Sequence, residues 1–314
     1  MSLTLLYRGP LQSCNYDCTY CPFGKRPHTP AELARDRQAL QRLVAWIGEQ
    51  GSQSPRAKRR SLTRSAELSA RNMKPVTRVL FTPWGEGLIH EHYQQAMVQL
   101  SRLPHIRRVA IQTNLSGALH WLDACDPRRV GVWATYHPAH QPLSRFVERC
   151  LELQRRGISF SVGMVGLREH LDLLETLRGE LSDAVYVWVN AFKDDPDYYR
   201  PDELRRLCAV DPLFELNLRP QASLGRTCRT GHDVVAVDGE GTVRRCPFVD
   251  EVLGQLYDGE LALHPEPRAC TAASCRCHIG YVHLVHLGLW ERFGEGLLER
   301  ALPAQERGRG GTSP

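Results

Sequence analysis

Three cysteines stand close together near the start of the chain, directly after the short apolar run Leu3 to Tyr7. Residues 13–22 read SCNYDCTYCP, which places Cys14, Cys18 and Cys21 at the spacing C-x3-C-x2-C. A loop this short cannot pair three thiols as disulfides, and soft sulfur ligands select iron-sulfur clusters or zinc. A four-iron cubane held by three protein sulfurs keeps one iron open to an outside ligand, whereas a closed structural site would require a fourth cysteine or histidine nearby. On spacing alone, a zinc knuckle or a redox thiol cluster also stays open.

Composition is that of an ordinary globular protein. The chain has 314 residues, with 42% apolar and 24% charged side chains, which is enough for one large α/β domain or two smaller ones. No apolar run reaches the length of a membrane span, and residues 1–20 lack the pattern of a signal peptide, so we expect a cytoplasmic protein. Eleven cysteines in a reducing compartment indicate metal sites rather than disulfides. The net charge of +5 is modest and does not argue for nucleic acid.

Strands and helices alternate after the cysteine loop. Thr29, Pro30 and Glu32 combine a capping residue, a proline at the first helical position and a glutamate three residues after the cap, which predicts a helix over 30–47. The other predicted elements are strands over 77–82, 108–113, 130–135, 158–165 and 184–190 and helices over 91–103, 118–125, 143–151, 170–181 and 201–210. Gly157 is expected to cap one of these helices. Six strand-helix units predict an α/β fold with a parallel sheet, in the shape of an open, partial (β/α)6 TIM-like barrel.

The cysteine loop resembles the signature of the radical S-adenosylmethionine (radical SAM) superfamily. That signature has the same spacing and an aromatic residue just before the third cysteine, here Tyr20. The resemblance implies that the three cysteines bind a [4Fe-4S] cluster whose free iron chelates the amino and carboxylate groups of S-adenosylmethionine. It also implies that Tyr20 packs near the adenine, and that the barrel is the radical SAM core.

The carboxyl ends of the later strands carry further points of resemblance. Pro83-Trp84-Gly85-Glu86-Gly87 looks like the superfamily's Gly-Gly-Glu turn, with Trp84 in place of the first glycine. Glu86 would accept a hydrogen bond from the ammonium of S-adenosylmethionine, and Gly85 would let the backbone approach the methionine moiety.

Three more strand ends resemble cofactor-binding positions of the superfamily. Thr113 and Asn114 match its Thr-Asn pair, although an ordinary turn would also use asparagine. His137 takes the place where family members bind the ribose or the carboxylate, and it could instead carry a proton or be a loop histidine. Met164 and Val165 lie where the family places backbone beside the adenine.

A second group of cysteines follows the barrel. Cys228 and Cys246 flank a predicted hairpin that turns at 238–241, and Cys270, Cys275 and Cys277 come after it. The order resembles the SPASM or twitch auxiliary-cluster domains of radical SAM enzymes, which implies one additional [4Fe-4S] cluster. Spacing does not decide which two of the last three cysteines join Cys228 and Cys246, and a zinc ribbon stays open.

The resemblance and the composition together suggest how the chain is divided. We expect 1–212 to be the core, 213–302 the auxiliary-cluster domain and 303–314 a disordered tail. The basic stretch 51–74 is predicted to be an insertion that forms a solvated loop. We favour this over a nucleic-acid-binding segment, because no aromatic residues that could stack on bases lie between the basic ones. An amphipathic closing helix is predicted over 279–302. Cys150 is expected to lie in the core, and Cys125 and Cys208 are expected to have structural roles. His283 and His286 are expected to be packing or surface residues.

Residues 7–10 and 277–281 resemble a small bacterial subgroup of stand-alone radical SAM proteins. The implied activity is that of an oxidoreductase or modifying enzyme: the reduced cluster cleaves S-adenosylmethionine to methionine and a 5'-deoxyadenosyl radical, which abstracts a substrate hydrogen atom. A flavodoxin or ferredoxin would supply the electron. Modification of a peptide or natural product is the leading hypothesis for the substrate, and we expect neither a membrane nor nucleic acid as a partner. The alternative is a zinc-stabilised binding module that uses the basic stretch 56–64 to hold RNA or an acidic protein.

Overall fold

The computed structural model describes residues 2–21, 23, 26–52, 74–193, 195 and 197–303. Most of the predicted insertion at 51–74 and nearly all of the predicted tail lie outside the described residues. The chain forms two compact units. The first comprises Met1–Gln112, Ser116–Val130 and Cys228–Arg268, and the second comprises Thr113–Leu115, Gly131–Thr227 and Ala269–Pro314. The domain boundaries given above stay a prediction.

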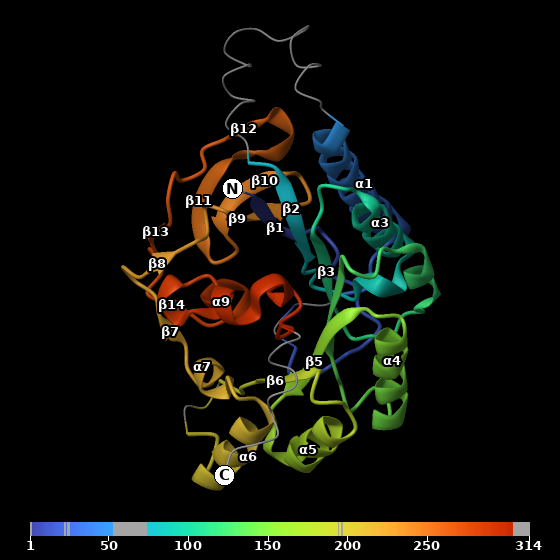
Figure 1. Ribbon diagram of the computed structural model, residues 1–314, viewed down its shortest axis with the longest axis vertical. Coiled ribbons are helices and arrows are strands. Elements are labelled where there is room, and N and C mark those ends of the chain that lie inside the picture. Colours follow the sequence, from blue (N-terminus) through green and yellow to red (C-terminus); the bar gives the residue numbers. More distant parts are fainter. Residues whose placement is uncertain are drawn as a thin grey trace, which may run out of the picture. The chain divides into compact units, whose positions relative to one another are not determined.

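The first unit is built on the N-terminal strand β1 (Leu3–Arg8). On one side β1 pairs in parallel with β2 (Val76–Phe81), which pairs in parallel with β3 (Arg108–Thr113). On its other side β1 pairs in parallel with β9 (Val234–Asp238), with Thr4 opposite Val234. The antiparallel strands β10 (Thr242–Cys246), β11 (Val249–Gln255) and β12 (Glu260–Leu261) extend the sheet from β9 (Figure 1). The predicted hairpin at 238–241 is therefore confirmed, and its first strand continues the sheet of the N-terminus.

Two long helices lie side by side in the first unit, α1 (Pro30–Ser52) and α3 (Glu91–Arg102) (Figure 1). The predicted helix start is confirmed, since the Thr29 amide donates to Glu32 Oε2 over 2.9 Å and the Glu32 amide donates to Thr29 Oγ1 over 3.3 Å. Leu40, Leu43 and Ile47 recur at helical spacing and are fully buried. The predicted short helix near 118–125 is the 3-10 helix η3 (His120–Ala124), and η2 (Gly87–Ile89) follows β2.

The second unit contains three further parallel strands, β4 (Val130–Thr135), β5 (Ser159–Val165) and β6 (Tyr186–Asn190). Its helices are α4 (Leu143–Arg155), α5 (Leu171–Gly179), α6 (Pro201–Val210) and α7 (Phe214–Leu218), with the 3-10 turn η4 (Arg168–His170) before α5. Gly157 has φ +68°, as a helix cap requires. Cys150 is fully buried on α4, which confirms its predicted place in the core.

The two faces of β4–β6 differ in chemistry. Side chains alternate along each strand, and paired residues of parallel strands point to the same face. One face is wholly apolar at the central positions, with Val132, Ala134, Val162, Met164, Val187 and Val189. The other face carries Trp133, Ser161 and Trp188, together with Gly163, whose missing Cβ leaves room for the Trp188 ring.

The end of the chain does not form the single closing helix predicted over 279–302. It breaks into α8 (His278–Tyr281), η6 (Val285–Leu287), α9 (Leu289–Phe293) and η7 (Gly294–Gly296). The reason is that Gly288 and Gly294 adopt φ values of 62° and 52°, which stop a right-handed helix. The remaining short elements are β7 (Gln221–Ala222), β8 (Thr227–Cys228), η5 (Leu256–Asp258), β13 (Arg268–Ala269) and β14 (Ser274–Cys275).

The α/β class and the six parallel strands followed by helical segments are confirmed. None of the helices in the described ranges is long and apolar enough to cross a membrane.

Candidate functional site

The cysteine loop leaves the carboxyl end of β1 and crosses the carboxyl end of β2. The Glu86 amide donates a hydrogen bond to the Ser13 carbonyl over 3.1 Å. A Cβ built on Gly85 would lie 1.8 Å from the same carbonyl oxygen and 2.6 Å from its carbon. The two backbones therefore touch one residue before Cys14, and only glycine at position 85 permits this contact.

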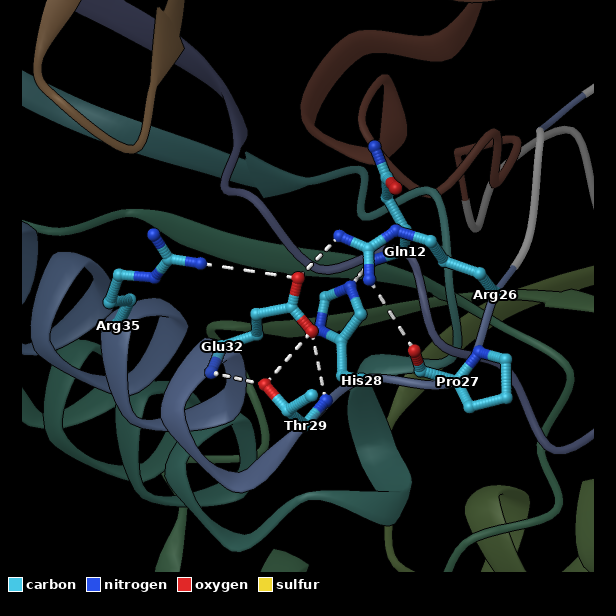
Figure 2. Close-up of polar contacts among 7 residues, drawn as sticks. All are labelled: Gln12, Arg26, Pro27, His28, Thr29, Glu32 and Arg35. Carbon is cyan, nitrogen blue, oxygen red and sulfur yellow. Dashed lines mark hydrogen bonds and ion pairs between the residues drawn. The ribbon is translucent and has the colours of Figure 1, made fainter.

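The two ends of the loop are joined at the start of α1. The Gln12 amide donates to His28 Nε2 over 3.2 Å, as Figure 2 shows. Thr29 and Glu32 then cap the helix, and Arg26 pairs with the Glu32 carboxylate (Figure 2). This ion pair is the main reason that the pKa of Glu32 is lowered to about 2. The loop is thus closed at its base by a hydrogen bond and a capped helix.

The three thiols of the loop are half-buried, and one of them accepts a backbone hydrogen bond. Cys14 Sγ accepts a hydrogen bond from the Tyr16 amide over 3.4 Å, and the Cys21 amide donates to the Cys18 carbonyl over 3.2 Å. Burial, followed by the neighbouring Cys18 thiol, raises the pKa of Tyr20 well above its ordinary value, so the Tyr20 hydroxyl lies beside this cysteine. Within the described ranges, no three or more histidine, cysteine, aspartate or glutamate side chains converge as ligands of one ion.

Glu86 is a buried carboxylate at this end of the sheet. Its side chain is 2% exposed, and Oε1 accepts from the Leu88 amide over 2.9 Å. Across the loop, Asn15 Nδ2 donates to Ser116 Oγ over 3.0 Å, which ties the loop to the segment after β3. The part of the loop beside Cys14 is consequently fixed between the turn that carries Glu86 and the segment after β3.

Trp84, which replaces the first glycine of the Gly-Gly-Glu turn, lies on the outside. Its ring is 39% exposed and stacks on Phe23 with the ring centroids 6.1 Å apart. The Arg8 guanidinium lies 5.9 Å from each ring centroid and donates through Nε to the Thr82 carbonyl. Trp84 can replace the smaller glycine because its side chain points outward and stacks on Phe23, two residues after Cys21.

Sequence reasoning missed a buried polar group beneath the loop. Asp36 on α1 is fully buried and bonds His92 Nε2 on α3 over 2.7 Å, and it also accepts from the Tyr93 hydroxyl over 3.4 Å. A Cβ on Gly9 would lie 2.9 Å from this carboxylate. Asp36 is four residues before Leu40, on the apolar stripe of α1, and this position was the signal that could have revealed it.

In the second unit, the predicted Thr113 and Asn114 are both buried. Thr113 Oγ1 accepts from the Leu115 amide over 2.9 Å, and the Asn114 carbonyl accepts from Gln141 Nε2 over 3.2 Å. The Gln141 carbonyl in turn accepts from the Tyr136 hydroxyl over 3.2 Å. Gln141, which the sequence did not single out, therefore joins the ends of the third and fourth strands.

His137 follows Tyr136 and is half-buried, with its carbonyl accepting from the His140 amide over 3.0 Å. Val165 is half-buried at the end of β5, opposite Asn190. Met164 is 1% exposed, and by alternation its side chain is on the apolar face of the sheet. Any contact of Met164 with a ligand on the polar face would therefore be made by its backbone.

The auxiliary cysteines fall in both units. In the first unit, Cys228 and Cys246 are buried; Cys228 Sγ lies 3.2 Å from Thr230 Oγ1, and Cys246 Sγ accepts from the Phe248 amide over 3.4 Å. Cys14, Cys228 and Cys246 thus share one feature: the sulfur of each contacts a polar group of the residue two positions later in the chain. Where the polar group donates a hydrogen bond, it stabilises negative charge on a sulfur that binds a metal.

In the second unit, the Cys275 thiol lies 4.0 Å from the Cys277 carbonyl oxygen, and Cys270 belongs to a different segment. Cys275 on β14 pairs with Gln221 on β7, while Cys270 bridges Leu224. Lys193 Nζ donates to the Arg276 carbonyl over 2.8 Å and to Asn217 Oδ1 over 2.6 Å. Burial, opposed by the nearby Cys277 thiol, lowers the pKa of Lys193 to about 8.

Among known proteins, several solved structures are similar to this chain. No protein-family model matches the chain, and no curated protein matches it. The structure entitled native anSMEcpe with bound AdoMet and Cp18Cys peptide is similar over 82% of this chain and 78% of its own, with 14% identity and a TM-score of 0.48. The structure of BtrN in complex with AdoMet and 2-DOIA is similar over 82% of this chain and 80% of its own, with 16% identity and a TM-score of 0.33.

Proposed function

We propose that the chain is a radical SAM enzyme in which Cys14, Cys18 and Cys21 hold a [4Fe-4S] cluster that binds S-adenosylmethionine. The observation that carries the proposal is the contact between Ser13 and the turn at Gly85 and Glu86. It supports the proposal because it joins the loop that carries the three cysteines to the turn that carries the buried Glu86 carboxylate, at the carboxyl ends of neighbouring parallel strands, where barrel enzymes gather their chemistry. The donor set fits the group, because soft thiolates are the ligands of iron-sulfur clusters.

When bound, the cluster would supply one electron to S-adenosylmethionine, whose carbon-sulfur bond breaks to give methionine and a 5'-deoxyadenosyl radical that takes a hydrogen atom from the substrate. The chain's own residues bind and orient. Glu86, fixed by the Leu88 amide, offers a carboxylate to the cofactor ammonium. Tyr20 offers an aromatic face for the adenine, which helps to hold the cofactor in one orientation.

The polar strand ends of the second unit are proposed as the remaining cofactor contacts. Thr113 and Asn114 are held by local hydrogen bonds, so their positions are fixed before any ligand arrives. His137 would contact the ribose or carboxylate, and the backbone at Met164 and Val165 would lie beside the adenine. Replacing His137 by Gln should raise the KM for S-adenosylmethionine more than it lowers kcat, since a binding contact acts mainly on the bound cofactor.

The auxiliary cysteines are proposed to hold a second [4Fe-4S] cluster. Cys228 and Cys246 would be two of its ligands, and two of Cys270, Cys275 and Cys277 would complete the set. The contacts with polar groups at Cys228 and Cys246 support ligation by thiolate. This cluster would accept an electron from the substrate radical or bind the substrate.

Metal analysis and cofactor cleavage test the proposal. Protein purified without oxygen should be brown, with roughly eight irons per chain for two clusters. Reduction with dithionite should release 5'-deoxyadenosine, and Cys18→Ala should abolish that release. Cys228→Ala should lower the iron to roughly four per chain, whereas Cys208→Ala, on α6, should change neither quantity. A colourless zinc protein that leaves S-adenosylmethionine intact would instead identify a zinc-stabilised binding module.

The substrate class and the reductant are proposed from the resemblance alone. A peptide or natural product is the proposed substrate, and a reduced flavodoxin or ferredoxin the proposed electron donor. Candidate substrates can be ranked by how strongly each raises the yield of 5'-deoxyadenosine. A peptide set that leaves the yield unchanged would exclude peptide modification without affecting the cofactor assignment.

A further inference from the structure

A buried arginine lies against the tryptophans on the polar face of β4–β6 in the second unit, and its charge interacts with the buried carboxylate of Asp211. Arg300 is 2% exposed, and its guanidinium lies 5.3 Å from the Trp133 ring and 4.9 Å from the Trp188 ring. Within the described part of the chain, Nε and Nη1 of Arg300 are buried without a hydrogen-bond acceptor. A buried cation in this state is costly, because both its charge and its donors have lost water.

The backbone around Arg300 is held in place by contacts specific to this segment. Ser159 Oγ donates to Glu299 Oε1 over 2.7 Å, and Ser161 Oγ donates to the Glu299 carbonyl. The Ala301 amide donates to the Gly296 carbonyl over 2.9 Å. Arg300 itself has φ +55°, a left-handed conformation that costs energy for a residue with a side chain. The fold therefore directs this side chain between the two tryptophans at an energetic cost.

Three more buried nitrogens without a hydrogen-bond partner belong to the rings of the same cluster. In the residues that the structure describes, Trp133 Nε1, Trp188 Nε1 and His278 Nε2 have no hydrogen-bond partner. The rings touch one another, with centroids 5.8 Å apart for Trp133 and Trp188 and 5.4 Å apart for Trp133 and His278. The indole nitrogens are donors only, and the imidazole nitrogen can donate when it carries the proton. Counting Nε and Nη1 of Arg300, five buried nitrogens of this cluster thus lack a hydrogen-bond partner within the described residues.

Two carboxylates lie near Arg300, and the arginine charge opposes the rise that burial causes in the pKa of Asp211. Asp211 accepts from the Tyr186 hydroxyl, from the Val189 amide over 2.9 Å and from the Leu213 amide over 2.9 Å. Glu299 accepts from Ser159, as described above. A second cation, Lys193, bonds Asn217 and the Arg276 carbonyl rather than a carboxylate. Among the described residues, neither carboxylate accepts a hydrogen bond from Nε or Nη1 of Arg300.

We propose that Arg300, Trp133, Trp188 and His278 form a binding site for a monovalent anion, either the carboxylate of a ligand or a free halide. Native structures seldom leave buried donors unpaired, and an arginine surrounded by N–H groups favours a negatively charged acceptor over water. The low polarity of the aromatic walls strengthens the attraction between the anion and the guanidinium. This site does not depend on radical chemistry.

Chloride NMR tests the proposal on the full-length, cluster-loaded protein in its oxidised state. Bound chloride broadens the free chloride line, and the broadening falls as a competing anion fills the site. We expect a saturable excess linewidth that Arg300→Met reduces at least about tenfold and that Arg300→Lys partly restores, because the charge is retained. Arg206→Met is the matched control, since Arg206 pairs on the surface with Asp172 and Glu175.

Conservative tryptophan variants keep the test valid if Arg300→Met does not fold. Trp133→Phe and Trp188→Phe remove an unpaired N–H and keep a ring, so each should weaken chloride binding severalfold. Trp290→Phe is the control, because its indole N–H already donates to His283 Nδ1 over 3.1 Å. Competition by millimolar acetate at constant ionic strength would assign the site to a carboxylate, and its failure would assign it to a halide. A linewidth that is the same in wild type, Arg300→Met and both tryptophan variants would overturn the proposal and leave water as the acceptor.

Discussion

Replacing Gly85 by alanine should detach the cysteine loop from β2. The new Cβ would lie 1.8 Å from the Ser13 carbonyl oxygen and 2.6 Å from the carbonyl carbon. Both are backbone atoms, so no side-chain rotation relieves the overlap, and the loop must move by more than 1 Å to reach ordinary contact distance near 3.4 Å. That movement breaks the 3.1 Å hydrogen bond from the Glu86 amide to Ser13, one residue before Cys14.

The size of the effect follows from two contributions. Overpacking against fixed atoms costs about 1–3 kcal/mol, and the lost hydrogen bond adds about 1 kcal/mol. Gly85→Ala should therefore lower the free energy of unfolding of the metal-free chain by about 2–4 kcal/mol. Because the displaced loop carries the cysteines, the release of 5'-deoxyadenosine should also fall, by more than the loss of folded protein explains.

Gly48→Ala is the matched control for this substitution. Gly48 lies within α1, and a Cβ there would meet nothing within 4 Å. This substitution should stabilise the chain by about 1 kcal/mol, since alanine favours the helix. Urea unfolding and iron analysis after anaerobic reconstitution measure both variants. If Gly85→Ala loads iron and unfolds like wild type, Ser13 does not contact the β2 turn and the proposed site geometry is wrong.

Three further predictions concern single side chains. Arg26 keeps the folded-state pKa of Glu32 at about 2, below the ordinary 4.5, so the stability that this carboxylate contributes is complete above 4.5 and lost as the pH falls toward 2. Glu32→Gln should remove this contribution to the acid unfolding of the metal-free chain, which circular dichroism follows. If the variant and the wild type unfold at the same acid pH, the Arg26–Glu32 ion pair does not stabilise the chain. Cys150 is buried and burial raises its pKa to about 12, so at pH 8 iodoacetamide should label the exposed Cys277 of metal-free protein but not Cys150. Peptide mass spectrometry distinguishes the two, and labelling of Cys150 in folded protein would refute its burial. Asp36→Ala should destabilise the chain by about 3 kcal/mol in urea, because its partners on α3 are left buried and unpaired; a loss below about 1 kcal/mol would show that the carboxylate does not hold the two helices together.

Local sequence signals predicted most of the secondary structure. The helix start at Thr29 was predictable because a capping box is formed by residues three apart. The strand over 108–113 was found with its observed bounds because a short apolar run ended by a polar pair has few alternative structures. The closing helix was predicted wrongly because apolar content was weighed above Gly288 and Gly294, whose left-handed backbone ends the helical turns.

Contacts between segments far apart in the chain could not be predicted from the sequence. Nothing near Val234 indicates that its strand pairs with β1 rather than forming a separate hairpin sheet, because parallel pairing depends on the global fold. The cysteines of the candidate site were readable from their spacing, but the contact between Ser13 and the β2 turn was not. Arg300 gave no signal either, since an arginine near a chain end is usually solvent-exposed.

The pairing of β9 with β1 explains why the N-terminal cysteines and the later hairpin belong to one compact unit. β1 lies between β2 and β9, so the loop that leaves it is flanked by the turns that follow both neighbours. Gly85 meets Ser13 on one side, and on the other a Cβ on Gly239 would lie 2.7 Å from the Pro10 ring. Both turns therefore need glycine where the loop passes. Since β1 would become an edge strand without β9, the hairpin that separates Cys228 from Cys246 also supports the loop that carries Cys14. Damage to this hairpin should therefore weaken the cluster binding that we propose for the loop.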